Sequence, residues 1–253
     1  MLKYVVITLV VAALLGAAGA CFTRGAFELP HHVELYKIIE SSEVVVNGSD
    51  QIRVDIYRPE NKSRNFTVLL LHGSGGIHEL GPQQVSRYAS TLAALGFTSL
   101  VVHYFDGTGN FVADYDEEQK NYWEWVDDIR SVISWADSLP YVNQHEVSVL
   151  GISLGGFIGV GLGTVDKRVK RLVLVGGGLE PFLLDSLRQA PPMLLLHGEN
   201  DEEVALVEPR KLLLLMHKMG RQAQLVVYPG QGHRLDDSAS ADALIRTSKF
   251  LLH

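Results

Sequence analysis

Ser153 has the sequence surroundings expected of a nucleophile. It is the central residue of Gly-Ile-Ser-Leu-Gly (151–155), which matches the pattern G-x-S-x-G. In that pattern the serine occupies a sharp turn from a strand into a helix, and the glycines leave room where the backbone folds back on itself. The strand-like segment VSVL precedes it, and a segment rich in small residues follows. We predict that Ser153 is a nucleophile, with a plain helix cap as the alternative.

A serine nucleophile needs a general base, and the base needs an acidic partner that fixes its tautomer. His233 lies in a glycine-containing loop after the apolar run 223–229, and Asp201 lies in the loop after the run 192–198. The chain order Ser, Asp, His is one in which such triads occur. We therefore predict Asp201 as the acid and His233 as the base, while three neighbouring acidic residues remain alternatives to Asp201: Glu199, Glu202 and Glu203.

Acyl transfer also requires N–H groups that stabilise the negative charge developing on the substrate oxygen. The glycine-rich segment LHGSGG (71–76) follows an apolar run. We predict one backbone donor at Ser74 and a second at Leu154, with a plain turn as the alternative for the glycine-rich segment. His72 and His78 have no third ligand at a suitable spacing, so neither a metal nor another cofactor is expected.

Strand-like and helix-like segments alternate through most of the chain, which predicts an α/β fold with a mainly parallel central sheet and helices on both faces. Parallel strands would bring the loops of the three proposed catalytic residues to one edge of the sheet. The predicted strands are 67–73, 98–105, 147–152, 171–177, 192–198 and 223–229, and the predicted helices are 82–95, 118–138, 154–164, 209–219 and 236–251.

The segment EVVVNGSDQIRVDIYRP (43–59) contains two β-rich runs around Asn47-Gly48, which predicts an antiparallel hairpin at the sheet edge. Asn47-Gly48-Ser49 also matches a glycosylation acceptor, but we interpret it as turn chemistry. The stretch 178–190 is too short to hold a large lid. The loop 106–119 follows a predicted strand, and we expect it to form a wall of the site.

The composition excludes one class of partner. The chain has 253 residues, with 22 basic and 29 acidic side chains and a net charge of −7. The sequence contains no run of basic residues that could neutralise phosphates, so nucleic acid is not an expected partner. The length and the 47% hydrophobic content are those of one globular domain with a single large core.

The first 21 residues differ from the rest, because an apolar stretch follows Lys3 and ends in small residues at Cys21. We interpret residues 1–20 as a bacterial export signal, 21–42 as a lead-in and 43–253 as the folded domain. Cys21 is the only cysteine, so lipidation at this position would explain its presence. Simple cleavage and a retained anchor are the alternatives, and mass analysis of the mature N-terminus distinguishes them. We expect an exported protein, periplasmic or attached to the membrane through its N-terminus only.

Five segments in this order resemble the α/β-hydrolase superfamily, and within it the dienelactone hydrolase-like family of small members without a lid: LHGSGG, HYFDGTG, LGISLGG, LLLHGENDEEV and YPGQGH. The resemblance covers residues 44–252. It implies that Ser153 is the nucleophile, Asp201 the acid and His233 the base, and that Ser74 and Leu154 line the oxyanion hole. The chain departs from the family in one respect, because dienelactone hydrolases use Cys where this sequence has Ser153.

Together these features predict a serine hydrolase that cleaves a small carboxylic ester or lactone through an acyl-enzyme intermediate. Cleavage of acyl thioesters or peptides is the nearest alternative, because the same triad supports it. A noncatalytic exported binding protein of the same fold is a further alternative. Such a protein would be expected to have lost a member of the triad, and this sequence retains candidates for all three. The oligomeric state has no signal in the sequence.

Overall fold

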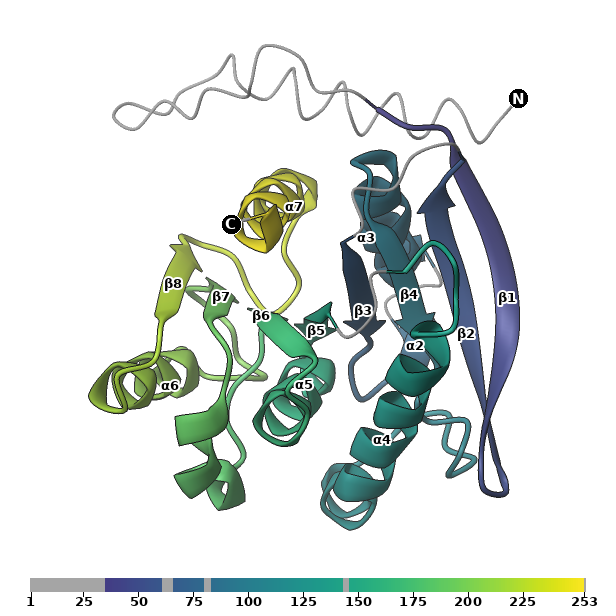
Figure 1. Ribbon diagram of the computed structural model, residues 1–253. Coiled ribbons are helices and arrows are strands. Elements are labelled where there is room, and N and C mark those ends of the chain that lie inside the picture. The colour runs from purple at the N-terminus through teal and green to yellow at the C-terminus, as the bar shows by residue number, and fades with distance from the viewer. Residues whose placement is uncertain (1–34, 61–65, 80–82, 143–145, 253) are drawn as a thin grey trace.

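The computed structural model describes residues 35–60, 66–79, 83–142 and 146–252. Cys21 and the predicted export signal lie outside these residues. The described strands form one eight-stranded sheet in the order β1-β2-β4-β3-β5-β6-β7-β8 (Figure 1). The strands are β1 (Ile38–Asn47), β2 (Asp50–Pro59), β3 (Thr67–Leu71), β4 (Thr98–Val102), β5 (Val147–Ile152), β6 (Val169–Val175), β7 (Met193–Gly198) and β8 (Ala223–Tyr228).

The sheet combines an antiparallel edge with a parallel centre, as the sequence predicts. β1 and β2 form a hairpin around the turn at Asn47 and Gly48, and β2 pairs antiparallel with β4. From β4 to β8 all neighbouring strands are parallel. The central strands β3, β4 and β5 are buried at every position, because helices cover both of their faces.

Two separate apolar clusters lie on the two faces of the sheet. α3 (Gln83–Ala94) and α7 (Asp237–Leu252) pack on one face, and α4 (Tyr115–Ala136), α5 (Leu154–Val165) and α6 (Val207–Lys218) pack on the other. Figure 1 shows this three-layer arrangement, with the short α2 (Gly76–Glu79) after β3. Alternating residues of β3 enter different clusters: Leu69 and Leu71 join the cluster beneath α4, α5 and α6, whereas Val68 and Leu70 join the cluster beneath α3 and α7. The predicted α/β-hydrolase architecture is confirmed.

Some boundaries differ from the sequence-based expectation. β1 begins at Ile38, inside the stretch interpreted as a lead-in, because pairing with β2 supplies the hydrogen bonds that this weakly patterned segment needs. β4 ends at Val102, so the last three residues of the predicted strand belong to the following loop. α4 begins at Tyr115 rather than at residue 118. There the side chains of Asp114 and Glu117 form a reciprocal capping box.

The connection between β6 and β7, described throughout, contains only two short 3-10 helices, η2 (Pro181–Leu183) and η3 (Asp185–Gln189). It therefore holds no lid domain, as predicted. No helix within the described ranges combines the length and the apolar character needed to cross a membrane.

Candidate active site

Ser153 occupies a strained turn between β5 and α5. Its φ is 50° and its ψ is −120°, and it is the only residue other than glycine with a positive φ among those described. The flanking glycines permit this turn, because a Cβ atom on Gly151 would collide with the backbone of Gly155. A Cβ atom on Gly155 would collide with the backbone after β3. Backbone strain of this kind is characteristic of functional positions, and the turn raises the Ser153 side chain above the sheet.

The glycine-rich loop after β3 lies beside Ser153. A Cβ atom on Gly73 would be 3.3 Å from Ser153 Cβ, so only glycine permits this close approach without movement of a neighbour. The loop is fixed further along, because the backbone N–H of Ala113 donates to the Ser74 carbonyl at 2.8 Å. On the other side of Ser153, Leu154 begins α5, and N–H groups in the first turn of a helix have no acceptor within the helix. Both predicted oxyanion donors therefore border the nucleophile.

His233 and Asp201 are brought together from the loops after β8 and β7. His233 Nδ1 lies 2.8 Å from Asp201 Oδ2. Because an ionised carboxylate only accepts hydrogen bonds, the neutral imidazole carries its proton on Nδ1 and presents Nε2 as an acceptor. The second oxygen, Asp201 Oδ1, accepts from the backbone N–H groups of Glu203 and Val204 at 3.0 and 2.8 Å. The Asp201 side chain is wholly buried, so these contacts hold it in one orientation.

The alternative acids occupy other positions. Glu199 accepts a hydrogen bond from the backbone N–H of Gly230 at 3.0 Å, and Glu202 is exposed. Glu203 Oε2 lies 3.6 Å from His233 Nε2, the opposite nitrogen from the one that Asp201 contacts. Of the four acidic side chains in this loop, Asp201 is the one with the geometry of a triad acid.

His197 also contacts Asp201, and no sequence motif pointed to this histidine. Its Nε2 lies 2.7 Å from the Val204 carbonyl and 3.2 Å from Asp201 Oδ2. Both partners accept, so Nε2 carries the proton. Burial lowers the pKa of His197 below its usual range, which keeps the ring neutral at pH 7. A neutral donor holds the carboxylate in place without competing with His233 as a charged partner.

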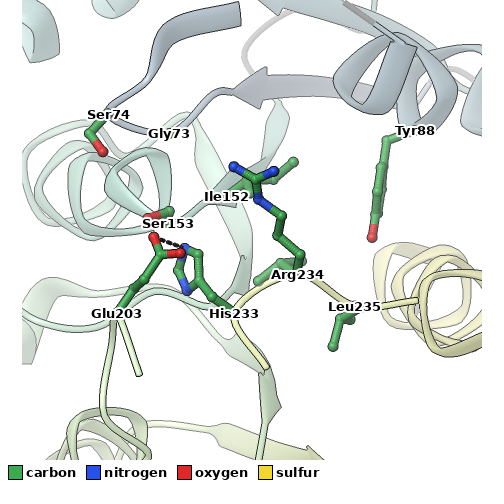
Figure 2. A pocket seen from close by; sticks show the side chains of 10 residues that line it. Gly73, Ser74, Tyr88, Ile152, Ser153, Glu203, His233, Arg234 and Leu235 are labelled. Atoms are coloured by element: carbon green, nitrogen blue, oxygen red, sulfur yellow. Dashed lines mark ion pairs between the residues drawn. The ribbon is translucent and has the colours of Figure 1, made fainter. Parts of the chain in front are cut away.

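One pocket contains Ser153, His233, Gly73 and Ser74, so the predicted nucleophile, base and oxyanion loop share it. Figure 2 shows the Ser153 side chain next to the imidazole of His233, with the Glu203 side chain beside the same ring. Five further residues complete the lining: Tyr88, Ile152, Val175, Arg234 and Leu235. Arg234 and Leu235 directly follow His233, and that adjacency is a signal the sequence analysis did not use. Tyr88 is a buried residue of α3.

The loop 106–119 was expected to form a wall of the site, but none of the residues that line the pocket belongs to it. It contacts the glycine-rich loop from outside, through the hydrogen bond from Ala113 to Ser74. His72 does not form a metal site in the described residues, where no three His, Cys, Asp or Glu side chains are grouped to hold an ion. Its ring instead stacks on Tyr104, with the centroids 4.2 Å apart. His78 lies in a part of α2 whose side chains are outside the described set.

The sequence profile of the family described as "Dienelactone hydrolase family" matches residues 52–244, which is most of the chain. The chain belongs to the dienelactone hydrolase family. The matched region contains all the residues of the pocket, and of the described strands β1 alone lies wholly outside it. Membership of this family supports a hydrolase that acts on ester bonds.

Solved structures show the same fold at low sequence identity. A dienelactone hydrolase-like promiscuous phosphotriesterase from metagenomic libraries has a TM-score of 0.72 and 17% identity, covering 85% of this chain and 98% of its own. A cold-adapted esterase from an Arctic intertidal metagenomic library has a TM-score of 0.65 and 20% identity, covering 85% of this chain and 93% of its own. At these identities the likeness establishes the fold alone.

A curated relative is an uncharacterized protein of Pseudomonas aeruginosa, 27% identical over 124 residues. The match covers 48% of this chain and 32% of the relative. This chain therefore matches about a third of the relative's length.

Proposed function

We propose that this member of the dienelactone hydrolase family is a serine hydrolase that cleaves a carboxylic ester or lactone through an acyl-enzyme intermediate. One arrangement carries the proposal: His233, which is hydrogen-bonded to the buried Asp201, lines the same pocket as Ser153. A nucleophile, a base and an acid in this relation are what acyl transfer needs. These groups suffice for formation of the acyl-enzyme, because the chain itself supplies both the attacking oxygen and the proton acceptor.

In the proposed mechanism, Ser153 Oγ attacks the carbonyl carbon of the ester while His233 Nε2 takes the Oγ proton. The negative charge on the carbonyl oxygen is stabilised by the N–H groups of Ser74 and Leu154. The bond to the alcohol oxygen then breaks, and Nε2 returns the proton to that oxygen. Water repeats the sequence on the acyl-enzyme, with His233 again as the base, and the acid is released.

The strained turn at Ser153 supports the nucleophilic role over a plain helix cap. A capping serine would normally accept a hydrogen bond from an N–H group in the first turn, with ordinary extended backbone angles. Ser153 instead has a positive φ, and its side chain makes no capping hydrogen bond. The strain is explained by the need to present Oγ to the pocket.

Replacing Ser153 by alanine tests the proposal. We expect Ser153→Ala to lower kcat on small aryl esters by at least about 10⁴-fold, because the acyl-enzyme cannot form. The variant should also lose covalent labelling by a fluorophosphonate. Ser138→Ala, which alters an exposed serine beyond the end of α4, is the matched control and should behave as the wild type. Normal turnover by Ser153→Ala would exclude the mechanism, and an inert wild type would favour a noncatalytic binding protein.

A further inference from the structure

Glu203 lies beside Nε2 of the His233 imidazole, the nitrogen that exchanges protons in the proposed reaction. Its Oε2 is 3.6 Å from His233 Nε2, whereas Asp201 contacts Nδ1. Glu203 lines the pocket, and its side chain is 66% exposed. Its backbone is fixed, because its N–H donates to Asp201 Oδ1 at 3.0 Å. The two acidic residues therefore lie at opposite nitrogens of one imidazole ring. The catalytic triad explains the position of Asp201 but not that of Glu203.

His233 Nε2 is the atom that donates a proton to the departing alcohol. In the proposed reaction, Nε2 first holds the proton from Ser153 Oγ and then delivers it to the alcohol oxygen as the acyl–oxygen bond breaks. That oxygen must come within hydrogen-bond distance of Nε2 for the transfer to occur. The rest of the alcohol extends outward from there. A carboxylate 3.6 Å from Nε2 is consequently a neighbour of the alcohol part of the substrate.

The negative charge of Glu203 favours one kind of alcohol. A carboxylate attracts a cationic group a few ångströms away and repels an anionic one, and the effect is modest where water screens it. Exposure of the Glu203 side chain leaves it free to follow a group that extends toward solvent. The other charged group in the pocket is Arg234, which Figure 2 shows on the side of the imidazole away from Glu203.

We propose that Glu203 determines specificity for the alcohol part of the substrate and selects esters whose alcohol carries an ammonium group. This inference rests on the proposed hydrolase function, since it assigns the alcohol to the side of His233 Nε2. It explains why a carboxylate that does not orient His233 is nevertheless held at the reacting nitrogen by the same loop that carries Asp201.

Two esters of the same carboxylic acid test this inference: the choline ester and the 3,3-dimethylbutyl ester. They have nearly the same shape and differ in whether a charged nitrogen or a neutral carbon carries the three methyl groups. The measured quantity is the ratio of kcat/KM for the choline ester to kcat/KM for the neutral ester. Glu203→Gln keeps the size of the side chain and leaves the backbone N–H of residue 203 in place. Glu202→Gln is the matched control on the exposed neighbour.

We expect Glu203→Gln to lower this ratio about fivefold, which is the size of an exposed ion pair. Glu202→Gln should keep the wild-type ratio, and salt near 0.5 M should reduce the difference between wild type and Glu203→Gln. The positive charge of Arg234 is the same in all three proteins, so it cancels from the comparison. Hydrolysis of both esters with the same ratio in wild type and Glu203→Gln overturns this inference alone. Hydrolysis of small aryl esters but of neither of these two esters also overturns this inference alone, whereas a wild type that hydrolyses none of these esters overturns the proposed function, and the inference with it.

Discussion

At the scale of single residues, Gly176 lies directly against the side chains of the proposed base, His233, and the proposed acid, Asp201. It follows β6 with a φ of +63°, which glycine adopts without strain. A Cβ atom here would lie 3.0 Å from His233 Cε1, 3.2 Å from His233 Nδ1 and 3.6 Å from Asp201 Oδ2. The absence of a side chain at Gly176 therefore sets where the imidazole rests. Gly176 is a positioning residue, because it touches the base rather than the substrate.

Gly176→Ala should lower kcat on aryl esters by about 10- to 100-fold, because a displaced imidazole misaligns proton transfer. The left-handed backbone should also cost about 1 kcal/mol of folding free energy. Gly220→Ala separates the two effects, since Gly220 has a φ of +69° and open space around its Cβ position. Steady-state kinetics and urea unfolding of both variants measure them. Equal kcat in the two alanine variants would contradict the positioning role.

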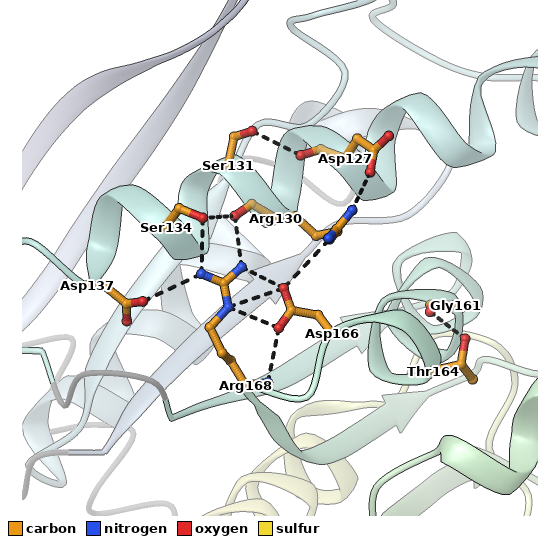
Figure 3. Close-up of polar contacts among 9 residues, drawn as sticks. All are labelled: Asp127, Arg130, Ser131, Ser134, Asp137, Gly161, Thr164, Asp166 and Arg168. Atoms are coloured by element: carbon orange, nitrogen blue, oxygen red, sulfur yellow. Dashed lines mark hydrogen bonds and ion pairs between the residues drawn. The ribbon is translucent and has the colours of Figure 1, made fainter.

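At the scale of elements, Arg168 joins the beginning of β6 to the end of α4 (Figure 3). Its guanidinium makes paired hydrogen bonds to Asp166, with Nε to Oδ1 at 2.9 Å and Nη2 to Oδ2 at 2.6 Å. The same group contacts Ser134 Oγ on α4 at 3.0 Å and Oδ2 of Asp137, the residue that caps the end of α4, at 3.5 Å. These contacts lie at the amino end of β6, so they stabilise the packing of α4 away from the site.

Burial opposes ionisation of Asp166, but the hydrogen bonds and charge of Arg168 outweigh it, and the pKa of Asp166 is lowered. A lowered folded-state pKa means that this contact stabilises the fold above pH about 4 and is lost as the pH falls further. Arg168→Ala should therefore destabilise the protein by about 2 kcal/mol at pH 7 and by less at pH 3.

Urea unfolding at the two pH values checks this prediction, with Lys170→Ala as the control on an exposed position of the same strand. Catalytic activity of folded Arg168→Ala should stay near that of the wild type. A loss of stability that does not depend on pH would show that packing of the long side chain, rather than the ion pair, is what β6 and α4 require.

At the scale of the whole molecule, Asp128 connects the edge hairpin to the body of the protein. This α4 residue is fully buried, and its Oδ1 accepts from Asn47 Nδ2 at 2.9 Å in the turn between β1 and β2. Its Oδ2 has no hydrogen-bond partner among the described residues. The amide of Asn47 is thus engaged with a buried carboxyl group, so this turn residue also serves as a tertiary contact.

Burial, together with the nearby acidic residues Asp50, Glu124 and Asp127, raises the pKa of Asp128 to about 6 against the hydrogen bond from Asn47. Because the folded-state pKa exceeds the unfolded value near 4, the wild type should lose stability as the pH rises from about 4 through 6. Asp128→Asn removes the ionisation and keeps an acceptor for Asn47. We expect it to be more stable than the wild type by about 2 to 3 kcal/mol at pH 8, because that is the free energy implied by a pKa near 6 in the folded state and near 4 in the unfolded state.

Thermal unfolding of Asp128→Asn between pH 4 and pH 8 tests this prediction, and Asp116→Asn, at an exposed position in the first turn of α4, is the control. The advantage of Asp128→Asn should disappear at pH 4, where the wild-type carboxyl is already protonated. A wild-type protein whose stability does not change over this range would contradict the assignment.

The sequence by itself determined the architecture and the chemical types at the site. Buried strands read as continuous apolar runs and the hairpin as an Asn-Gly turn, because these patterns express local backbone preferences and burial. The glycines around Ser153 predicted the tight turn, since their steric role is local. For the same reason, the capping box that begins α4 at Tyr115 was within reach of the sequence but was not recognised.

Only the tertiary structure decided which acidic side chain meets His233. Glu199, Asp201, Glu202 and Glu203 are adjacent in one loop, and their chemistry is too similar to separate them. The distances from Asp201 to Nδ1 and from Glu203 to Nε2 depend on how the β7 and β8 loops face each other across a parallel pair. The contacts of His197 and Gly176 have the same origin. Side-chain direction across neighbouring strands is set by sheet register and loop packing, which are long-range properties that a local sequence pattern does not contain.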